Sequence, residues 1–120
     1  MTVKALLTNM LDSLGYPVFL QGSILPEQEY PDSFITFFTL SSDDKEHFDN
    51  EVSAWSWLFQ VAFYSADPEL VESVPATIRK TLKNAGFIPQ GKGIDILSDE
   101  PTHTGWVQEF YFIERNDKNE

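Results

Sequence analysis

Few side chains in this 120-residue sequence carry groups suited to catalysis or metal binding. The two histidines are His47 and His103, and His103 follows Asp99 and Glu100 in the segment SDEPTHTG. Two carboxylates and an imidazole are possible ligands of a divalent metal, but their spacing matches neither a zinc motif nor an EF-hand loop. A hydrogen-bonded loop explains the segment better, so we expect no metal site.

Nucleophilic catalysis needs a serine or threonine beside a histidine base that a third group orients. No serine lies in a GxSxG segment. The run Gly91-Lys92-Gly93 lacks the strand-to-helix setting and the spacing of a phosphate-binding loop, so we expect a turn there. The sequence thus predicts no catalytic residue and no cofactor. A hydrolase with a site around Asp99, Glu100 and His103 is the least favoured alternative.

The length of 120 residues indicates a single domain covering residues 1–120, and a composition with 42% apolar and 14% aromatic residues is typical of a folded globular protein. The absence of cysteine excludes disulfides and thiolate metal sites. The first ten residues do not resemble a signal peptide, and no stretch approaches the roughly 20 apolar residues that span a bilayer. We therefore expect a soluble protein, made in a cytoplasm, that does not bind membranes.

The net charge is −11, and the eight lysines and arginines are scattered along the chain. A nucleic-acid interface needs such residues clustered on one surface. Sequence-specific binding of nucleic acid is therefore not expected. A soluble, self-repelling surface accounts for the acidity.

The strongest secondary-structure signal is a long strand over residues 54–64, in which large apolar residues occupy every second position. A helix is expected next. Asp67 suits its N-cap and Pro68 its first position, and Gly86 suits the left-handed residue that ends it. Pro75 lies too far inside for a first-turn proline, which predicts a kink or a restart of the helix.

The remaining elements are predicted from shorter patterns and are weaker individually. They are a helix over residues 3–14, capped by Thr2 and ended by Gly15; strands over 16–22, 34–40 and 106–114; polar loops over 23–31 and 41–50; an irregular stretch over 88–104 with a short strand at 94–97; and a frayed tail over 115–120.

This order, α-β-β-β-α-β, predicts a two-layer α+β sandwich. We expect a mostly antiparallel sheet of about four strands with both helices on one face. The second helix is also placed where a right-handed crossover would make the strands over 54–64 and 106–114 parallel.

The seventeen aromatic residues exceed what a small two-layer core must hold. One face of the last strand carries Trp106, Phe110 and Phe112, and the other carries Val107, Tyr111 and Ile113. One interpretation is that such a face is buried only in an assembly. The alternative is that both faces are covered within the monomer.

Several segments resemble proteins of tailed-phage and prophage morphogenesis, namely the tail terminator and head–tail joining families of siphophages. The entry Tyr30-Pro31-Asp32-Ser33-Phe34-Ile35-Thr36-Phe37 is similar to theirs, although Phe37 stands where that family has tryptophan. Further segments follow in the same order as in that family, and the last of them is the most specific: VAFYS (61–65), AGF (85–87), GKGID (91–95) and SDEPTHTG (98–105).

The resemblance implies a structural protein without enzymatic activity that assembles into a ring, usually a hexamer. The ring would cap the tail tube, bind the major tail tube protein and link it to the head-completion or connector protein. Such a subunit would occur in the host cytoplasm and then in the virion. The alternative from a different class is a small monomeric bacterial binding or regulatory domain.

A ring subunit needs surfaces that contact its neighbours, and the predicted loops over 41–50 and 88–105 are long enough to provide them. We hypothesise that the acidic residues of the first loop face the ring channel or the tail tube, where an acidic lumen would repel passing DNA phosphates. The full set of predicted interface residues is Asp43, Asp44, Glu46, Asp49, Asp99, Glu100, His103 and Trp106.

Overall fold

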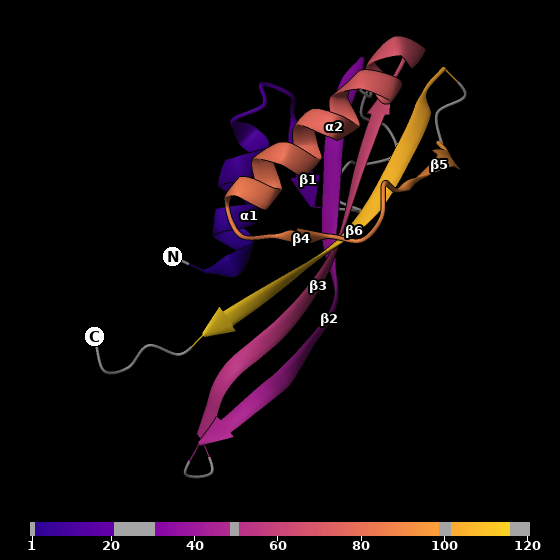
Figure 1. Ribbon diagram of the computed structural model, residues 1–120. Helices are drawn as coiled ribbons and strands as arrows, with labels where there is room; N and C mark the ends of the chain where they lie inside the picture. The colour runs from indigo at the N-terminus through magenta and orange to yellow at the C-terminus, as the bar shows by residue number, and fades with distance from the viewer. Residues whose placement is uncertain (1, 21–30, 49–50, 99–101, 116–120) are drawn as a thin grey trace.

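The computed structural model describes residues 2–20, 31–48, 51–98 and 102–115, and for residues 44–48 and 51–53 it describes the backbone only. The fold is α+β, with two helices and a mostly antiparallel six-stranded sheet (Figure 1). The strands lie in the order β1-β2-β3-β6-β4, and β5 also pairs with β6. The elements are α1 (Val3–Asp12), β1 (Val18–Leu20), β2 (Ser33–Phe48), β3 (Glu51–Ser65), α2 (Pro68–Asn84), β4 (Ile88–Pro89), β5 (Ile94–Leu97) and β6 (Thr104–Arg115).

The strand predicted over residues 54–64 is confirmed as the central strand, β3. It pairs antiparallel with β2 on one edge and with β6 on the other. Its alternation divides the sheet into two faces, because successive side chains of a strand point to opposite sides. Phe59, Val61 and Phe63 lie on one face and are fully buried.

The second helix begins and ends where the sequence predicts. The Asp67 carboxylate accepts a hydrogen bond from the Glu69 amide at 3.0 Å, Pro68 opens the helix, and Gly86 has a φ of 102°. The predicted restart at Pro75 is wrong, because α2 runs without a break through this buried proline. Apolar packing retains the helical backbone where proline removes one hydrogen bond.

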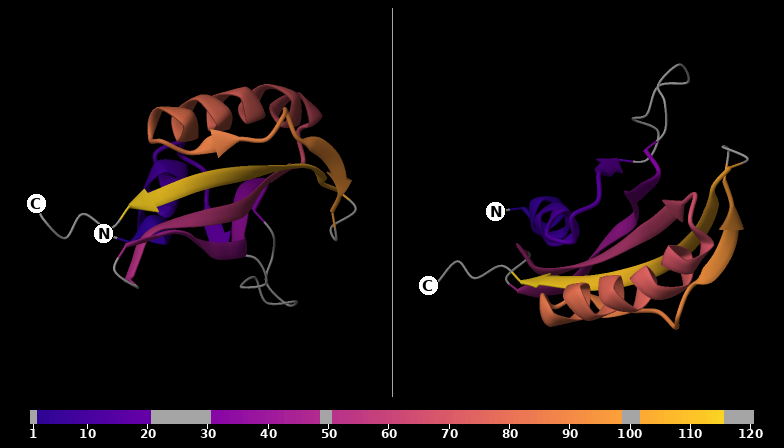
Figure 2. Two further views of the ribbon diagram at one scale, coloured as in Figure 1. Left: turned by 60° about the horizontal axis from the view of Figure 1, so that its bottom comes forward. Right: turned by 90° about the horizontal axis from the view of Figure 1, so that it is seen from above.

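Both helices pack on the face of the sheet that carries Phe59, Val61 and Phe63, as predicted. Figure 2 shows α2 lying along the strands on this side. The helices supply the following buried residues to one cluster with these side chains: Val3, Leu7 and Leu11 from α1, and Val71, Val74, Ile78 and Leu82 from α2. We call this the helix-side face. The opposite face, which the described helices leave uncovered, is called the open face and carries Leu58, Gln60, Val107, Glu109, Tyr111 and Ile113.

The acidic loop predicted over residues 41–50 is wrong for most of its length, because β2 continues to Phe48. Register shifts between Thr39 and Ser41 and between Asp44 and Glu46 mark β-bulges in this part of β2. A bulge inserts an extra residue into one strand, so it interrupts the alternation by which a strand is recognised. Residues 41–48 have a polar sequence, but they form a strand because their backbone pairs with β3. Asn50 and residues 21–30, which include most of the other predicted loop, lie outside the described residues.

The predicted parallel arrangement of β3 and β6 is also wrong, because these strands are antiparallel neighbours. After α2 the chain forms β4 and β5, which both pair antiparallel with β6 and therefore run in the same direction as β3. The helix α2 does connect two parallel strands, β3 and β4, but β6 lies between these strands in the sheet. The prediction missed the reversal between β5 and β6 and the two-residue strand β4.

The molecule is elongated, with principal extents of 53 × 29 × 22 Å. Figure 1 shows β2 and β3 running on together past both helices, and the end of β6 also lies beyond them. We call this extension the arm, and define it as residues 40–48 of β2, 51–58 of β3 and 111–115 of β6. Arg115, predicted to begin a frayed tail, is the last residue of β6. Neither helix is long and apolar enough to cross a membrane, as judged over the described residues.

Replacing Asp67 with alanine should lower the free energy of unfolding by about 1 kcal/mol, because the first turn of α2 loses its capping acceptor. Urea denaturation followed by tryptophan fluorescence measures the effect. Asp67→Asn is the matched control, since its side-chain oxygen can still cap the helix. Equal losses in the two variants would show that the cap does not contribute to stability.

Candidate functional site

The acidic residues predicted to face a channel are on the arm. Asp43 is exposed and pairs with Ser56, and the backbone of Asp44 and Glu46 continues the same strand. Asp43 lies on the open face because the bulge after Thr39 shifts the register, and the backbone of Asp44 pairs with Trp55. Asp49, Asp99 and Glu100 lie outside the described residues. The channel-facing role of the acidic residues stays a prediction.

His103, proposed as an interface residue, is 8% exposed and is held by hydrogen bonds within the chain. Its Nε2 lies 2.8 Å from the Pro31 carbonyl oxygen and its Nδ1 lies 3.0 Å from the Thr102 hydroxyl. The carbonyl can only accept, so Nε2 is the protonated nitrogen and Nδ1 accepts from the hydroxyl in the neutral ring. The imidazole therefore joins the start of β6 to the segment before β2.

Three of the five segments quoted for the resemblance have residues in contact at one end of the sheet, around His103. The Phe34 ring lies 5.8 Å from the His103 ring and stacks on Tyr64 at 5.2 Å. The Ser33 and Ser65 hydroxyls are 2.8 Å apart, and the Ser65 hydroxyl also accepts from the Asp67 amide at 2.9 Å. Parts of the motifs at 30–37, 61–65 and 98–105 are thus in mutual contact. The contacts described for these segments join one segment to another within the chain.

The predicted turn at Gly91-Lys92-Gly93 is confirmed, and side chains of β6 and α2 hold it. The Trp106 indole donates to the Lys92 carbonyl at 2.9 Å, and the Arg79 guanidinium donates to the same oxygen at 3.1 Å. Trp106, another predicted interface residue, is 4% exposed because its ring packs in the core. Its described contacts fix the turn in place.

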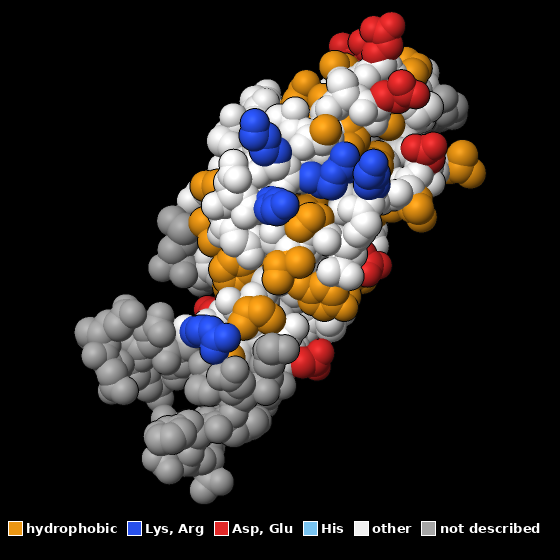
Figure 3. Space-filling model, viewed as in Figure 1, with side chains coloured by type: hydrophobic (Ala, Val, Ile, Leu, Met, Phe, Trp, Pro, Cys, Tyr) orange, Lys and Arg blue, Asp and Glu red, His pale blue; other side chains and the backbone are white. Residues whose placement is uncertain are grey.

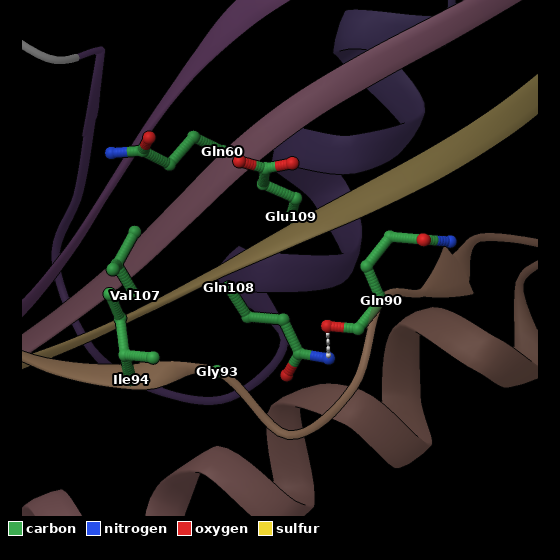
Figure 4. A pocket seen from close by; sticks show the side chains of 7 residues that line it. All are labelled: Gln60, Gln90, Gly93, Ile94, Val107, Gln108 and Glu109. Carbon is green, nitrogen blue, oxygen red and sulfur yellow. Dashed lines mark hydrogen bonds between the residues drawn. The ribbon is translucent and has the colours of Figure 1, made fainter.

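Gln108 holds the same turn from the next position along the helix-side face. Its amide nitrogen donates to the Gly91 carbonyl at 2.6 Å. It donates more weakly to the Gln90 carbonyl at 3.4 Å (Figure 4). The side chain is 2% exposed. A buried glutamine that bonds to main-chain oxygens gives the turn a defined position on the sheet.

A hollow of about 260 Å³ opens beside this turn, and Figure 4 shows its lining. The lining residues come from β3, β5, β6 and the turn, and they are Gln60, Gln90, Gly93, Ile94, Val107, Gln108 and Glu109. Glu109 is the only charged residue among them. The hollow therefore offers neither a paired acid and base nor a nucleophile with its base.

Within the described part of the chain, no group of three His, Asp or Glu side chains could hold a metal ion. This search does not cover Asp99 and Glu100, the predicted partners of His103. In the described geometry, both nitrogens of His103 bond to protein oxygens. The expectation of a protein without catalysis stays a prediction.

The open face and the arm leave several apolar side chains partly uncovered. Leu58 and Tyr111 pair directly across β3 and β6, Ile113 follows on the same side, and all three are only half-buried. On the helix-side face of the arm, Trp57 stacks on Phe59 and donates to a Glu114 carboxylate oxygen at 3.0 Å. Trp106 and Phe110 are covered within the chain, whereas Tyr111 and Ile113 are not.

The sequence did not indicate the arm, because the β2 half of the arm reads as an acidic loop. The turn at residues 91–93 was predicted, but the side chains of β6 that hold it were not. The alternation of Val107, Tyr111 and Ile113 did indicate the open face. The polar residues between Ser41 and Phe48 gave no comparable signal.

Comparison with known protein families and with curated protein sequences finds no match to this chain.

Replacing Gly93 with alanine should lower the free energy of unfolding by about 3 kcal/mol. Gly93 has a φ of 83°, and a Cβ there would collide with the Trp106 indole nitrogen and lie 2.5 Å from the Val107 carbonyl oxygen. Gly91→Ala is the control, because Gly91 also has a positive φ but no atom near an added Cβ. We expect it to cost about 1 kcal/mol. If chemical denaturation shows the same loss of unfolding free energy for Gly93→Ala and Gly91→Ala, the close packing of Gly93 against Trp106 and Val107 would be contradicted.

Proposed function

We propose that this protein is a structural subunit of phage or prophage morphogenesis, a tail terminator or head–tail joining protein that acts by assembly. The observation that carries the proposal is the arm, a three-stranded extension with half-buried apolar residues on both faces beyond the helices. A lone monomer leaves these side chains partly in water, whereas a neighbouring subunit would cover them. The resemblance of residues 30–114 to those families supports the same assignment.

The open face is the proposed contact with the neighbouring subunit. When each subunit contacts the next through two different surfaces, the subunits form a closed ring if a whole number of the subunit-to-subunit rotations adds up to 360°. Such a contact needs an apolar centre with few charges. Leu58, Tyr111 and Ile113 provide this centre, and Glu109 lies next to it along the same face of β6.

The acidic stretch of the arm is proposed to face the channel or the tail tube. The strand carries Asp43, Asp44 and Glu46 within four residues, and Asp43 is exposed. An acidic wall would repel DNA phosphates and let the genome pass without binding. A structure of the assembled ring with these residues on its outer wall would refute this placement.

Negative-stain microscopy of the purified protein, alone and mixed with tail tubes assembled from the same genome, tests the proposal directly. We expect rings, or caps on tube ends that stop further growth. The absence of both would reject the terminator role and direct the test to head connectors. Free subunits need not form rings before they meet the tube.

Leu58→Glu should abolish rings or caps, because it places a charge in the centre of the open face. The matched control is Thr77→Glu, which adds the same charge at an exposed position of α2. Circular dichroism and urea denaturation must show that both variants fold. Caps that form equally well with Leu58→Glu would remove the open face from the proposed interface.

A further inference from the structure

We infer that the groove between α2 and β5 binds an extended peptide segment of another protein, which pairs with the free edge of β5 and places a C-terminal carboxylate near Arg79 and Lys92. The inference stands on residues outside the arm and the centre of the open face. It therefore does not depend on the proposed function.

The groove consists of two adjoining hollows of about 390 and 540 Å³. Both are lined by Val71 and Glu72 of α2 and by Asp95 of β5, so the two hollows adjoin along the groove. Pro75 and Trp106 add apolar surface to the larger hollow. Leu97 lines the smaller hollow and is 96% exposed.

β5 offers an unprotected sheet edge beside this groove. It pairs with β6 on one side and with no other described strand on the opposite side. Edge strands are usually blunted by lysines, prolines or bulges, whereas β5 has the sequence Ile-Asp-Ile-Leu and Ile94 is 67% exposed. An added strand would hydrogen-bond this edge and direct alternate side chains into the groove.

The positive charges lie at one end of the groove, which sets the direction of the bound peptide. Arg79 and Lys92 line only the larger hollow, whereas the carboxylates Glu72 and Asp95 line both hollows and are the only charged residues of the smaller one. In Figure 3, Lys and Arg side chains gather over the middle of this side of the molecule, and Asp and Glu side chains over its upper end. β5 starts beside Lys92 and runs away from it, so a peptide whose C-terminus lies at the cations pairs antiparallel with β5.

Arg79 is already positioned for a carboxylate. One guanidinium nitrogen donates to the Lys92 carbonyl at 3.1 Å, and that oxygen is fixed in turn by the Trp106 indole. A guanidinium has five N–H donors, so the group retains donors for a bound anion while its orientation is fixed. The same charge pattern disfavours a nucleic-acid strand, whose phosphates would meet Glu72 and Asp95.

A fluorescein-labelled peptide, Lys-Thr-Val-Thr-Val-Thr-Val, is a suitable probe, because it combines a basic start, alternating apolar residues and a free C-terminal carboxylate. Fluorescence anisotropy with the full chain should show saturable binding that is at least five-fold tighter than for the C-terminally amidated peptide. Amide chemical shifts should change at residues 94–97 and along 71–79. An N-methylated peptide, which cannot pair with a strand edge, should not bind.

The double variant Arg79→Gln, Lys92→Gln should bind the acid and amide peptides equally. The matched control is Lys80→Gln, Lys83→Gln, which removes the same charge from exposed residues of α2 that do not line the groove. It should keep the five-fold preference. Lys92→Gln alone serves if the loss of Arg79 disturbs the turn, because the turn is held through the Lys92 main-chain oxygen.

Four outcomes would overturn the inference. They are equal affinity of the wild-type chain for the acid and amide peptides, binding of the N-methylated peptide, shift changes confined to the open face, and no binding at all. Sedimentation of the chain alone gives a further check. A dimer that occludes residues 94–97 would assign the groove to a second copy and reject the peptide.

Discussion

Hydrogen bonding on both edges of β3 limits where every other element can lie. From Ala54 to Ser65 this strand pairs with β2 and β6 at once, so its main-chain groups are satisfied only inside a sheet. Its helix-side face then presents Phe59, Val61 and Phe63 in a row, and this apolar surface must be covered. Both helices pack there, and α2 follows directly from the end of β3, so it returns along the strand it covers.

The sequence predicts the elements whose signals are local. The alternation in β3, the Asp67 cap and the Gly86 stop each depend on residues within a few positions of one another, and each is found as expected. The two-layer α+β architecture follows from their order. The open face was also visible as a second apolar series along β6.

Features that depend on distant residues could not be predicted in this way. Ser41 to Phe48 becomes a strand because β3 provides its hydrogen bonds, and the bulges remove the periodicity that would have revealed it. The position of β6 between β3 and β5 depends on the reversal after Leu97. Likewise, the candidate site was located only in part, because His103 and Trp106 are buried and hydrogen-bond to the distant carbonyl groups of Pro31 and Lys92.

The continuity of β3 has a mechanical consequence. The strand passes from the arm into the core without interruption. Figure 1 shows that the outer part of β2 and β3 lies beyond both helices, whereas the inner part of the arm is tied to the core through Trp57 and Phe112. A load applied to the tip would act along β3 and shear its ladders with β2 and β6, a geometry in which many hydrogen bonds share the force.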